Sequence, residues 1–223
     1  GICPDGGTPP NRGAGAMIAA HPFLEKLTWF HQASFRVEGG RFTIYIDPWE
    51  LAGADLPKAD LVLITHDHSD HCDEKAARWL RKPTAPLILH PGCPKKYPGT
   101  VKVLAPGQKH QVGQVTVEAV PAYNMRPDRL TYHPRANNWV GYILTIDGTR
   151  LYHAGDTDFI PEMKSLKVDI ALLPVGGTYT MDAAEAAEAA AAIKPQVAVP
   201  MHFGKIVGKP ADGERFRTLS TVP

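Results

Sequence analysis

The run THDHSDH, residues 65–71, constrains this chain more than any other feature of its sequence. It holds three histidines and two aspartates, and four of these follow the spacing H-x-H-x-D-H: His66, His68, Asp70 and His71. Imidazole and carboxylate groups are the side chains with which proteins bind zinc and similar divalent ions. The run therefore predicts one half of a metal site. The simpler alternative is a polar turn in which Ser69 caps a following helix.

The other half of such a site is found where later apolar segments end. The segment RLYHA leads into Asp156, and VAVPM leads into His202. A rigid strand that ends in a free loop is where proteins often place reactive side chains. His133, in the long loop 124–138, is a further candidate ligand.

The set of candidates matches a centre of two ions. A catalytic zinc ion takes three protein ligands and keeps one position for water, so two adjacent ions need about six ligands. His66, His68 and His133 can hold one ion, Asp70, His71 and His202 can hold the other, and Asp156 can bridge them. A random scatter of histidines would rarely divide in this way, which favours the metal site over the turn.

The other histidines and cysteines have simpler interpretations. His90 and His110 have no acidic or histidine neighbours in the sequence, so we expect them to be surface or hydrogen-bonded polar residues. His153 precedes Asp156 by three residues and is more simply a packing or supporting group than a ligand. Cys72, directly after the run, is expected to make a small apolar contact at the start of a helix.

The composition argues against several classes of function. Of the 223 residues 43% are hydrophobic, enough for a buried core, and the balance of 24 basic and 23 acidic residues argues against nucleic acid as a partner. No apolar run reaches the length of about 18 residues that a membrane-spanning helix needs. The 3 cysteines lack C-x-x-C spacing and predict a reducing compartment, the cytoplasm. We expect residues 1–16 to be a flexible leader or a cloning remnant, with Met17 as a candidate native start.

Short apolar segments rich in β-branched residues predict strands along the rest of the chain. These segments are residues 42–46, 61–65, 86–90, 101–105, 115–120, 139–146, 150–154, 169–175 and 196–201. Helices are predicted from Asp73 to about Lys82 and from Asp182 to about Lys194, where Glu185 would complete a capping box with Asp182. Together these elements predict one domain, residues 17–223, in which two sheets pack together with helices outside.

Three stretches, THDHSDH, GDTD and PMHFG, stand in this order, and each follows an apolar strand. In this the chain resembles the metallo-β-lactamase fold, and within it a branch of metal-dependent hydrolases related to ascorbate-6-phosphate lactonase and to the phospholipase D that acts on N-acyl-phosphatidylethanolamine. IYIDPW, AVPAYN and LLPVGGTYTMDAAEAA support the resemblance. It implies an α/β fold, a four-layer αββα sandwich with two ions at one edge between the sheets. The ligands that it implies are His66, His68, Asp70, His71, Asp156 and His202.

The chain departs from the family pattern at two places. Relatives usually carry Gly-His near the start of the fold, where this chain has His31 and Gln32, so each of these two is a candidate for the cleft. The third histidine of the first ion usually ends a strand, where this chain has Asn124. His133 is the expected substitute. If Asn124 stands there instead, the first ion is weakly held and the enzyme works with one.

The expected function is that of a dinuclear metal-dependent hydrolase. Two divalent ions, zinc first with manganese and iron as alternatives, would supply a bridging hydroxide that attacks an ester, lactone or phosphodiester. Asp70 would orient this nucleophile and shuttle a proton. Arg126 and Arg135 are candidates for binding an anionic group of a small-molecule substrate, although a solvated loop explains them equally well.

Three other functions stay open at this point: an iron-dependent redox enzyme on the same fold, a nuclease-like phosphodiesterase and a non-catalytic metal-binding module. The near-neutral charge argues against the nuclease. A ligand set with an open position argues against the module, because structural zinc sites are closed. A homo-oligomer is also left open.

Overall fold

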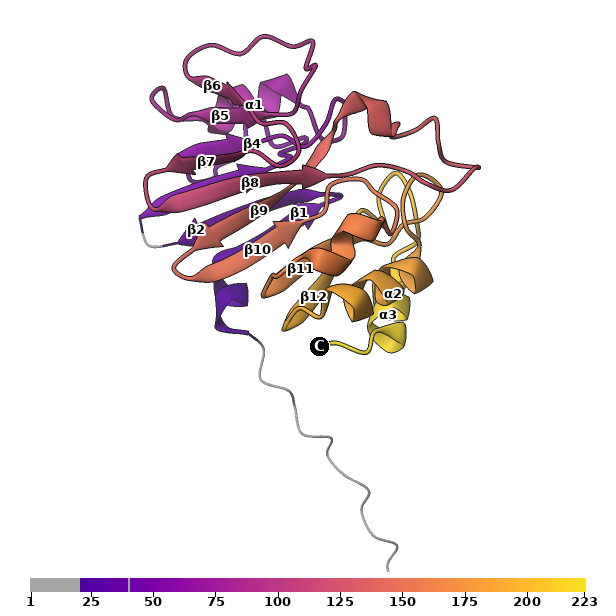
Figure 1. The fold of residues 1–223 in the computed structure, drawn as a ribbon. Coiled ribbons are helices and arrows are strands. Elements are labelled where there is room, and N and C mark those ends of the chain that lie inside the picture. Colours follow the sequence, from indigo (N-terminus) through magenta and orange to yellow (C-terminus); the bar gives the residue numbers. More distant parts are fainter. Residues whose placement is uncertain (1–20, 40) are drawn as a thin grey trace, which may run out of the picture.

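Two six-stranded mixed sheets form the centre of the molecule in this computed structural model, which describes residues 21–39 and 41–223 (Figure 1). The expected leader at 1–16 and the candidate start Met17 lie outside the described residues. Strand order is β1-β2-β3-β4-β5-β6 in the first sheet and β12-β11-β10-β9-β8-β7 in the second. Each sheet therefore uses one half of the chain, as two packed sheets require.

The first sheet comes from the first half of the chain. Its strands are β1 (Leu27–His31), β2 (Ser34–Gly39), β3 (Phe42–Ile46), β4 (Leu61–Leu63), β5 (Leu87–Leu89) and β6 (Val101–Val103). The strands β1 to β3 pair antiparallel, whereas β3 to β6 pair parallel. The strands β4 and β5 are buried on both faces, as their continuous runs of Leu, Ile and Val predict.

The second sheet comes from the second half of the chain. Its strands are β7 (Lys109–Val112), β8 (Val115–Pro121), β9 (Val140–Ile146), β10 (Thr149–His153), β11 (Ile170–Pro174) and β12 (Val197–Met201). The strands β7 to β10 pair antiparallel, whereas β10 to β12 pair parallel. Along Val115–Ala119 buried and half-buried residues alternate, which confirms the alternation predicted for VTVEAV.

Helices cover the outer faces of the two sheets and complete a four-layer αββα sandwich (Figure 1). They are α1 (Glu74–Leu80) on the first sheet and α2 (Ala183–Ile193) and α3 (Ala211–Leu219) on the second, with short 3-10 helices η1 (Pro22–Lys26), η2 (Arg135–Asn137) and η3 (Pro161–Ser165). This is the α/β architecture that the sequence predicts. Within the described part of the chain, no helix is long and apolar enough to cross a membrane.

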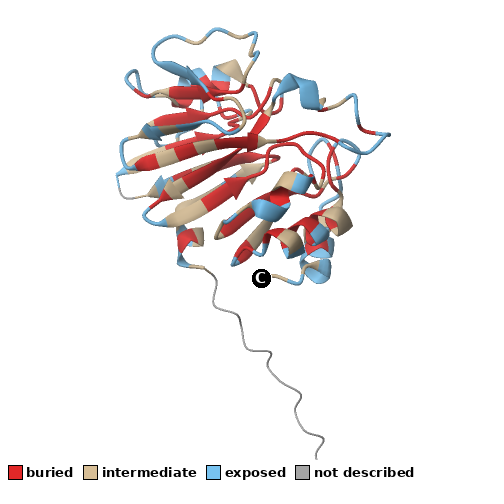
Figure 2. Ribbon diagram, in the orientation of Figure 1, coloured by how far each residue is buried: buried red, intermediate tan, exposed pale blue. Residues whose placement is uncertain are grey.

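The hydrophobic core forms two clusters, because successive side chains along a strand point to opposite faces of the sheet. Ile44 and Leu63 point between the sheets into the larger cluster, whereas Tyr45 and Val62 point to α1 and join the smaller one. Cys72 belongs to this smaller cluster, which confirms its expected apolar contact. Buried residues accordingly follow the strands through the centre of the molecule (Figure 2).

Several elements differ from the sequence prediction. The strands β1, β2 and β7 were not predicted. For β1 and β7 the reason is that they hold no fully buried residue and lie at the edges of their sheets, so they lack the apolar runs that mark the other strands. The predicted capping box of α2 is half right. Asp182 accepts the N–H of Glu185 at 2.9 Å, but the Glu185 carboxylate instead accepts hydrogen bonds from Arg126 and Arg129.

Candidate metal centre

The strands β4, β10 and β12 end at one edge of the sandwich and bring the predicted ligand-type side chains together. Two groups form there: His66, His68, His133 and Asp156 in one, and Asp70, His71 and His202 in the other. In each group the donor atoms lie within 4.8 Å of one another. All these residues are buried except His68, which is half-buried.

One carboxylate oxygen joins the two groups. Oδ2 of Asp156 lies 3.5 Å from Nε2 of His66 and 3.2 Å from Nε2 of His133. The same oxygen lies 3.2 Å from Nε2 of His71 and 3.1 Å from Nε2 of His202. Asp156 therefore lies between the groups, where a carboxylate that bridges two ions would lie.

Gln32 connects two members of the second group. Oδ2 of Asp70 lies 3.2 Å from Nε2 of His71 and 3.4 Å from Nε2 of His202, and it accepts a hydrogen bond from Nε2 of Gln32 at 3.0 Å. The backbone carbonyl of Gln32 accepts the N–H of His202 at 2.8 Å. Of the two candidates for the cleft, Gln32 reaches the centre, whereas the ring of His31 bonds a backbone carbonyl elsewhere.

The atoms that face this centre lack hydrogen-bond partners among the described residues. They are Nε2 of His66, His71, His133 and His202 and Oδ1 of Asp156, all of them buried. An unpaired buried polar group costs about 1–3 kcal/mol, and a bound cation satisfies nitrogen and carboxylate donors together. The set holds nitrogen and oxygen donors without sulfur, so the residues fit the divalent ions that the sequence implies.

Asp47 supports His71 from behind and was not among the predicted site residues. Its Oδ2 accepts from Nδ1 of His71 at 2.7 Å and from Oγ1 of Thr65 at 2.6 Å, and its Oδ1 accepts the Thr65 N–H at 2.8 Å. A carboxylate on Nδ1 leaves the lone pair on Nε2, the atom that faces the centre. Asp47 ends the strand IYI, so the same rule of strand ends could have found it.

Asn124 and His133, which the sequence presents as alternatives, are hydrogen-bonded partners at 2.7 Å between Oδ1 and Nδ1. Nδ2 of Asn124 donates to Oδ1 of Asp158 at 3.1 Å and to the carbonyl of Tyr179 at 2.9 Å. These two bonds aim the amide oxygen at His133. His133 lies in the first group and Asn124 lies behind it.

Trp139 forms an aromatic wall beside the first group. Its ring centroid lies 5.2 Å from that of His66, 5.1 Å from that of His68 and 6.0 Å from that of His133. Sequence reasoning missed this role because Trp139 opens an apolar strand segment, where an aromatic residue is expected to be part of the core.

Gly176 permits the close approach that positions His202. A Cβ atom at this position would lie 2.2 Å from the backbone oxygen of His202 and 3.3 Å from the side chain of Val207. Real Cβ atoms do not approach backbone oxygen so closely, so only glycine fits here without moving the end of β12.

Charge coupling within the centre shifts several pKa values. Burial alone would lower the pKa of His202, but the nearby carboxylates of Asp156 and Asp70 raise it to about 9. Burial alone would raise the pKa of Asp156, but the facing rings of His202, His71 and His66 hold it well below its usual range. At neutral pH the metal-free centre therefore holds an ionised carboxylate and a proton on His202, which a bound cation would replace.

The two arginines proposed for substrate binding are exposed and carry acidic partners. Nη1 of Arg126 lies 2.8 Å from Oε1 of Glu185, and Nη2 of Arg135 lies 3.6 Å from Oε1 of Glu162. Their side chains are 50% and 75% exposed, so Arg135 has the looser pairing and the freer guanidinium. A third arginine, Arg129, is buried against Asp158 and Glu185 and fixes the loop that carries His133.

Two histidines outside the centre, His153 and His90, have the roles predicted for them. His153 is buried and bonds the carbonyl of Ala33 at 2.9 Å, which confirms its packing role. His90 is buried and does have an acidic neighbour, since its Nε2 lies 2.5 Å from Oδ1 of Asp67. This contact confirms the expectation of a hydrogen-bonded polar residue, and its acidic partner comes near because β5 lies beside β4 in the folded chain.

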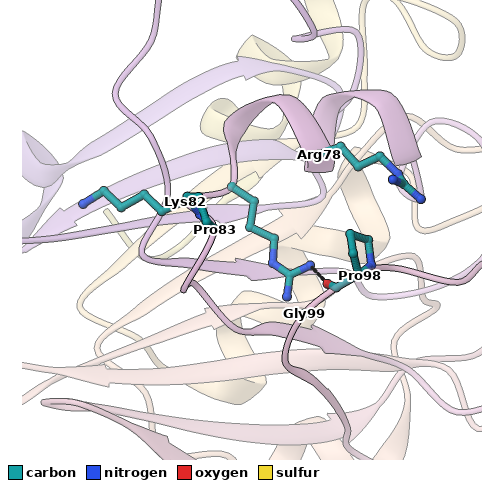
Figure 3. Close-up of a pocket in the computed structure, with 6 residues that line it drawn as sticks. Arg78, Lys82, Pro83, Pro98 and Gly99 are labelled. Carbon is teal, nitrogen blue, oxygen red and sulfur yellow. Dashed lines mark hydrogen bonds between the residues drawn. The ribbon is translucent and has the colours of Figure 1, made fainter.

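A cavity of about 400 Å³ beside α1 contains none of these residues (Figure 3). It is lined by Arg78, Arg81, Lys82, Pro83, Pro98 and Gly99. Arg81 spans it with hydrogen bonds to the carbonyls of Pro98 and Thr100, and Arg78 and Lys82 pair with acids. Because these basic groups are already paired with carbonyls or carboxylates, we assign the cavity no binding role.

Comparison with known proteins identifies the family. Residues 26–202 match the family model described as the beta-lactamase superfamily domain. The chain belongs to the metallo-β-lactamase superfamily. A UPF0173 metal-dependent hydrolase of Thermoplasma acidophilum is 34% identical over 210 residues, which cover 87% of this chain and 90% of the relative. Another, of Koribacter versatilis, is 35% identical over 221 residues, 88% of this chain and 93% of the relative.

Solved structures agree with this family. The crystal structure of a Parabacteroides distasonis protein has a TM-score of 0.78 and 39% identity, and the match covers 88% of this chain and 90% of that one. The metallo hydrolase Igni18 of Ignicoccus hospitalis has a TM-score of 0.65 and 27% identity over 88% of this chain and 93% of its own. Within the metallo-β-lactamase superfamily, this chain is thus one of the UPF0173 metal-dependent hydrolases. The narrower resemblance to the lactonase and the phospholipase D stays a prediction.

Proposed function

We propose that this metallo-β-lactamase-fold chain is a dinuclear hydrolase that acts on a small-molecule ester, lactone or phosphodiester. The convergence of four imidazole Nε2 atoms on one oxygen of Asp156 carries the proposal. Two groups of donors that share one carboxylate suit two adjacent ions better than one. The free thiols of Cys72 and Cys93 support a reducing compartment, for which we propose the cytoplasm.

Each group of donors would hold one ion. His66, His68 and His133 would bind the first, Asp70, His71 and His202 the second, and Asp156 would bridge them. Bound there, the ions would polarise the scissile oxygen and lower the pKa of a water between them to about 7, which provides a hydroxide nucleophile. Zinc is the first choice for this donor set, and manganese and iron are the alternatives.

Asp70 is the proposed catalytic residue. Its side chain is 12% exposed, so it can be reached from solvent, and Gln32 and His71 contact its Oδ2. A carboxylate held in this way can orient the attacking nucleophile and hand its proton to the leaving group. Trp139 adds an apolar ring beside His66 and His68, which would limit the access of water to the first ion.

An anionic group on the substrate would contact the loop that carries His133. Arg135 is the stronger of the two candidates because its guanidinium is 75% exposed and stands 3.6 Å from Glu162. Arg126 must first release Glu185, which it contacts at 2.8 Å. We propose Arg135, and to a lesser degree Arg126, as substrate-binding residues within a single hydrolase domain of residues 17–223.

The first experiment measures metal content by mass spectrometry on dialysed wild type and on Asp156→Ala, alongside hydrolysis of generic lactone and phosphodiester substrates. Asp55→Ala is the matched control, because Asp55 is exposed and forms no hydrogen bond or ion pair in the described residues. We expect wild type and the control to hold about two zinc or manganese ions per chain more than Asp156→Ala, which should also lose activity.

Other results would contradict the proposal. One ion per chain with full activity would rule out the dinuclear mechanism and leave a mononuclear hydrolase. Bound iron, an absorbance change on adding oxygen and no hydrolysis would support the redox alternative. A folded protein that binds no ion would reduce the run THDHSDH to a polar turn.

A further inference from the structure

A second cluster of ligand-type side chains lies next to the candidate centre but takes no part in it. Asp67, His90 and Cys93 each offer one donor atom, and these atoms lie within 4.8 Å of one another. Asp67 stands between His66 and His68 in the chain, and His90 and Cys93 come from the segment that follows β5. The cluster therefore joins the loop of two candidate ligands to a neighbouring loop.

His90 is the anchor of this cluster. Its side chain is fully buried, and its Nε2 lies 2.5 Å from Oδ1 of Asp67. Its Nδ1 is buried without a hydrogen-bond partner among the described residues. Asp67 and Cys93 are half-buried, which leaves the cluster open to ions from solvent.

The donor set differs from that of the candidate centre. It combines thiolate, imidazole and carboxylate, which is a typical combination for zinc and unsuited to magnesium or calcium. Donors bound to one zinc ion at about 2.0–2.3 Å lie about 3–4 Å apart in a tetrahedron. Oδ1 of Asp67 and Nε2 of His90 would separate by about 1 Å as an ion replaces the proton between them, and Asp67, 28% exposed, has room for that shift.

We propose that Asp67, His90 and Cys93 form a further binding site for one zinc-like ion, separate from the dinuclear centre. The fourth position of the ion is open to water. Because Asp67 lies between His66 and His68, an ion held here would brace the loop that presents both to the centre. The site depends on a thiolate, whereas the donor groups of the dinuclear centre contain none.

The thiolate gives the site its own spectroscopic signature. Metal-free full-length protein is titrated with cobalt(II), and the near-ultraviolet band of thiolate-to-cobalt charge transfer is recorded. We expect the band in wild type and also in Asp156→Ala, because the latter changes only the dinuclear centre. The band in Asp156→Ala separates this proposal from the proposed function, since it does not depend on hydrolysis or on a loaded dinuclear centre.

Three variants test the assignment. Cys93→Ala should lose the band and about one zinc ion per chain, and because Cys93 is half-buried this variant should fold. Cys72→Ala is the matched control and should keep the band, since Cys72 is not among the clustered donors and its thiol contacts Oη of Tyr97 at 3.4 Å. Asp67→Asn, of the same shape, should weaken cobalt binding at this site by at least about tenfold.

The opposite results would overturn the proposal. If wild type binds cobalt without the charge-transfer band, no thiolate ligates and the site does not exist. If the band survives Cys93→Ala, or disappears only in Cys72→Ala, the ion sits at another cysteine. If Asp67→Asn binds as tightly as wild type, the carboxylate is a hydrogen-bond partner of His90 and not a ligand.

Discussion

Oδ1 of Asn124 lies 2.7 Å from Nδ1 of His133. An amide oxygen only accepts hydrogen bonds, so Nδ1 of His133 carries the proton and Nε2 keeps its lone pair. That Nε2 faces Oδ2 of Asp156 at 3.2 Å. Asn124, at the strand end where the family resemblance implies a histidine, therefore orients the histidine that lies in the centre. We infer that Asn124 and His133 act as a pair.

The pair predicts a metal-binding defect in Asn124→Ala. Without the amide oxygen the ring of His133 can rotate or change tautomer, and loss of such a supporting partner typically lowers metal affinity about 10–100-fold. Isothermal titration calorimetry of zinc into metal-free protein measures the effect. Asn137→Ala is the control, because Asn137 is exposed and its side chain forms no hydrogen bond in the described residues. Equal affinities in both variants would show that His133 needs no support or is not a ligand.

The raised pKa of His202 predicts that metal binding releases a proton at neutral pH. Because Asp156 and Asp70 raise this pKa to about 9, His202 is protonated at pH 7 in the metal-free protein, and a cation must displace that proton. Apparent zinc affinity should therefore rise with pH through the neutral range, and His71, whose pKa the nearby Asp156 also raises despite its burial, adds to this rise. Calorimetry in buffers of different ionisation enthalpy counts the protons. A binding enthalpy independent of buffer at pH 7 would contradict the prediction.

His153 predicts a loss of stability in acid. Its Nε2 donates to the carbonyl of Ala33 at 2.9 Å, and its Nδ1 accepts the N–H of Gly155 at 3.2 Å, a bond that requires the neutral ring. Burial lowers the pKa of His153 below its usual value of about 6.5, so below that pH the unfolded chain takes up a proton that the folded chain does not. The contribution to the free energy of unfolding is fully present above about pH 6.5 and is lost as the pH falls.

The measurement for His153 is urea unfolding of metal-free wild type and His153→Gln between about pH 8 and about pH 5. Glutamine can keep a donor and an acceptor but does not titrate. Wild type should lose up to about 1.4 kcal/mol per pH unit more than the variant in the acid range. Parallel curves for the two proteins would mean that His153 does not titrate on unfolding in this range.

The exposed arginines predict a selective effect on substrate affinity. Arg135→Ala should raise KM for an anionic ester about three- to fivefold, because exposed charge pairs contribute roughly 0.2–1 kcal/mol. KM for a neutral ester of the same size should not change. Arg126→Ala should have a smaller effect, since Arg126 already contacts Glu185 at 2.8 Å. Unchanged KM values for both esters in both variants would remove the arginines from the substrate site.

Much of the candidate centre is predictable from local sequence. His66, Asp156 and His202 each follow an apolar strand, and parallel strands that end at one edge bring such residues together. The spacing within THDHSDH then limits which of its side chains can face the metal centre together with His66. The two predicted helices were found for a similar reason, because caps such as Asp73 and Asp182 act on residues close to them in sequence.

Other parts of the centre depend on contacts between distant segments. Gln32 reaches Asp70 across 38 positions of sequence, and Asp47 reaches His71 across 24. No local pattern pairs them, because these hydrogen bonds form only when the first sheet brings the loops after β1, β3 and β4 together. The choice between Asn124 and His133 is of the same type, since Asp158 and Tyr179 aim the amide.

The sequence by itself determined the family, the sandwich of strands and helices, and the residue types that face the centre, because these follow from periodicity and from strand ends. Only the tertiary structure decided which side chains support the candidate ligands, and that Asp67 meets His90 behind them. The physical reason is range. Propensity and burial act over a few residues, whereas the direction of a buried polar side chain is set by whichever partner the folded chain brings within hydrogen-bond distance.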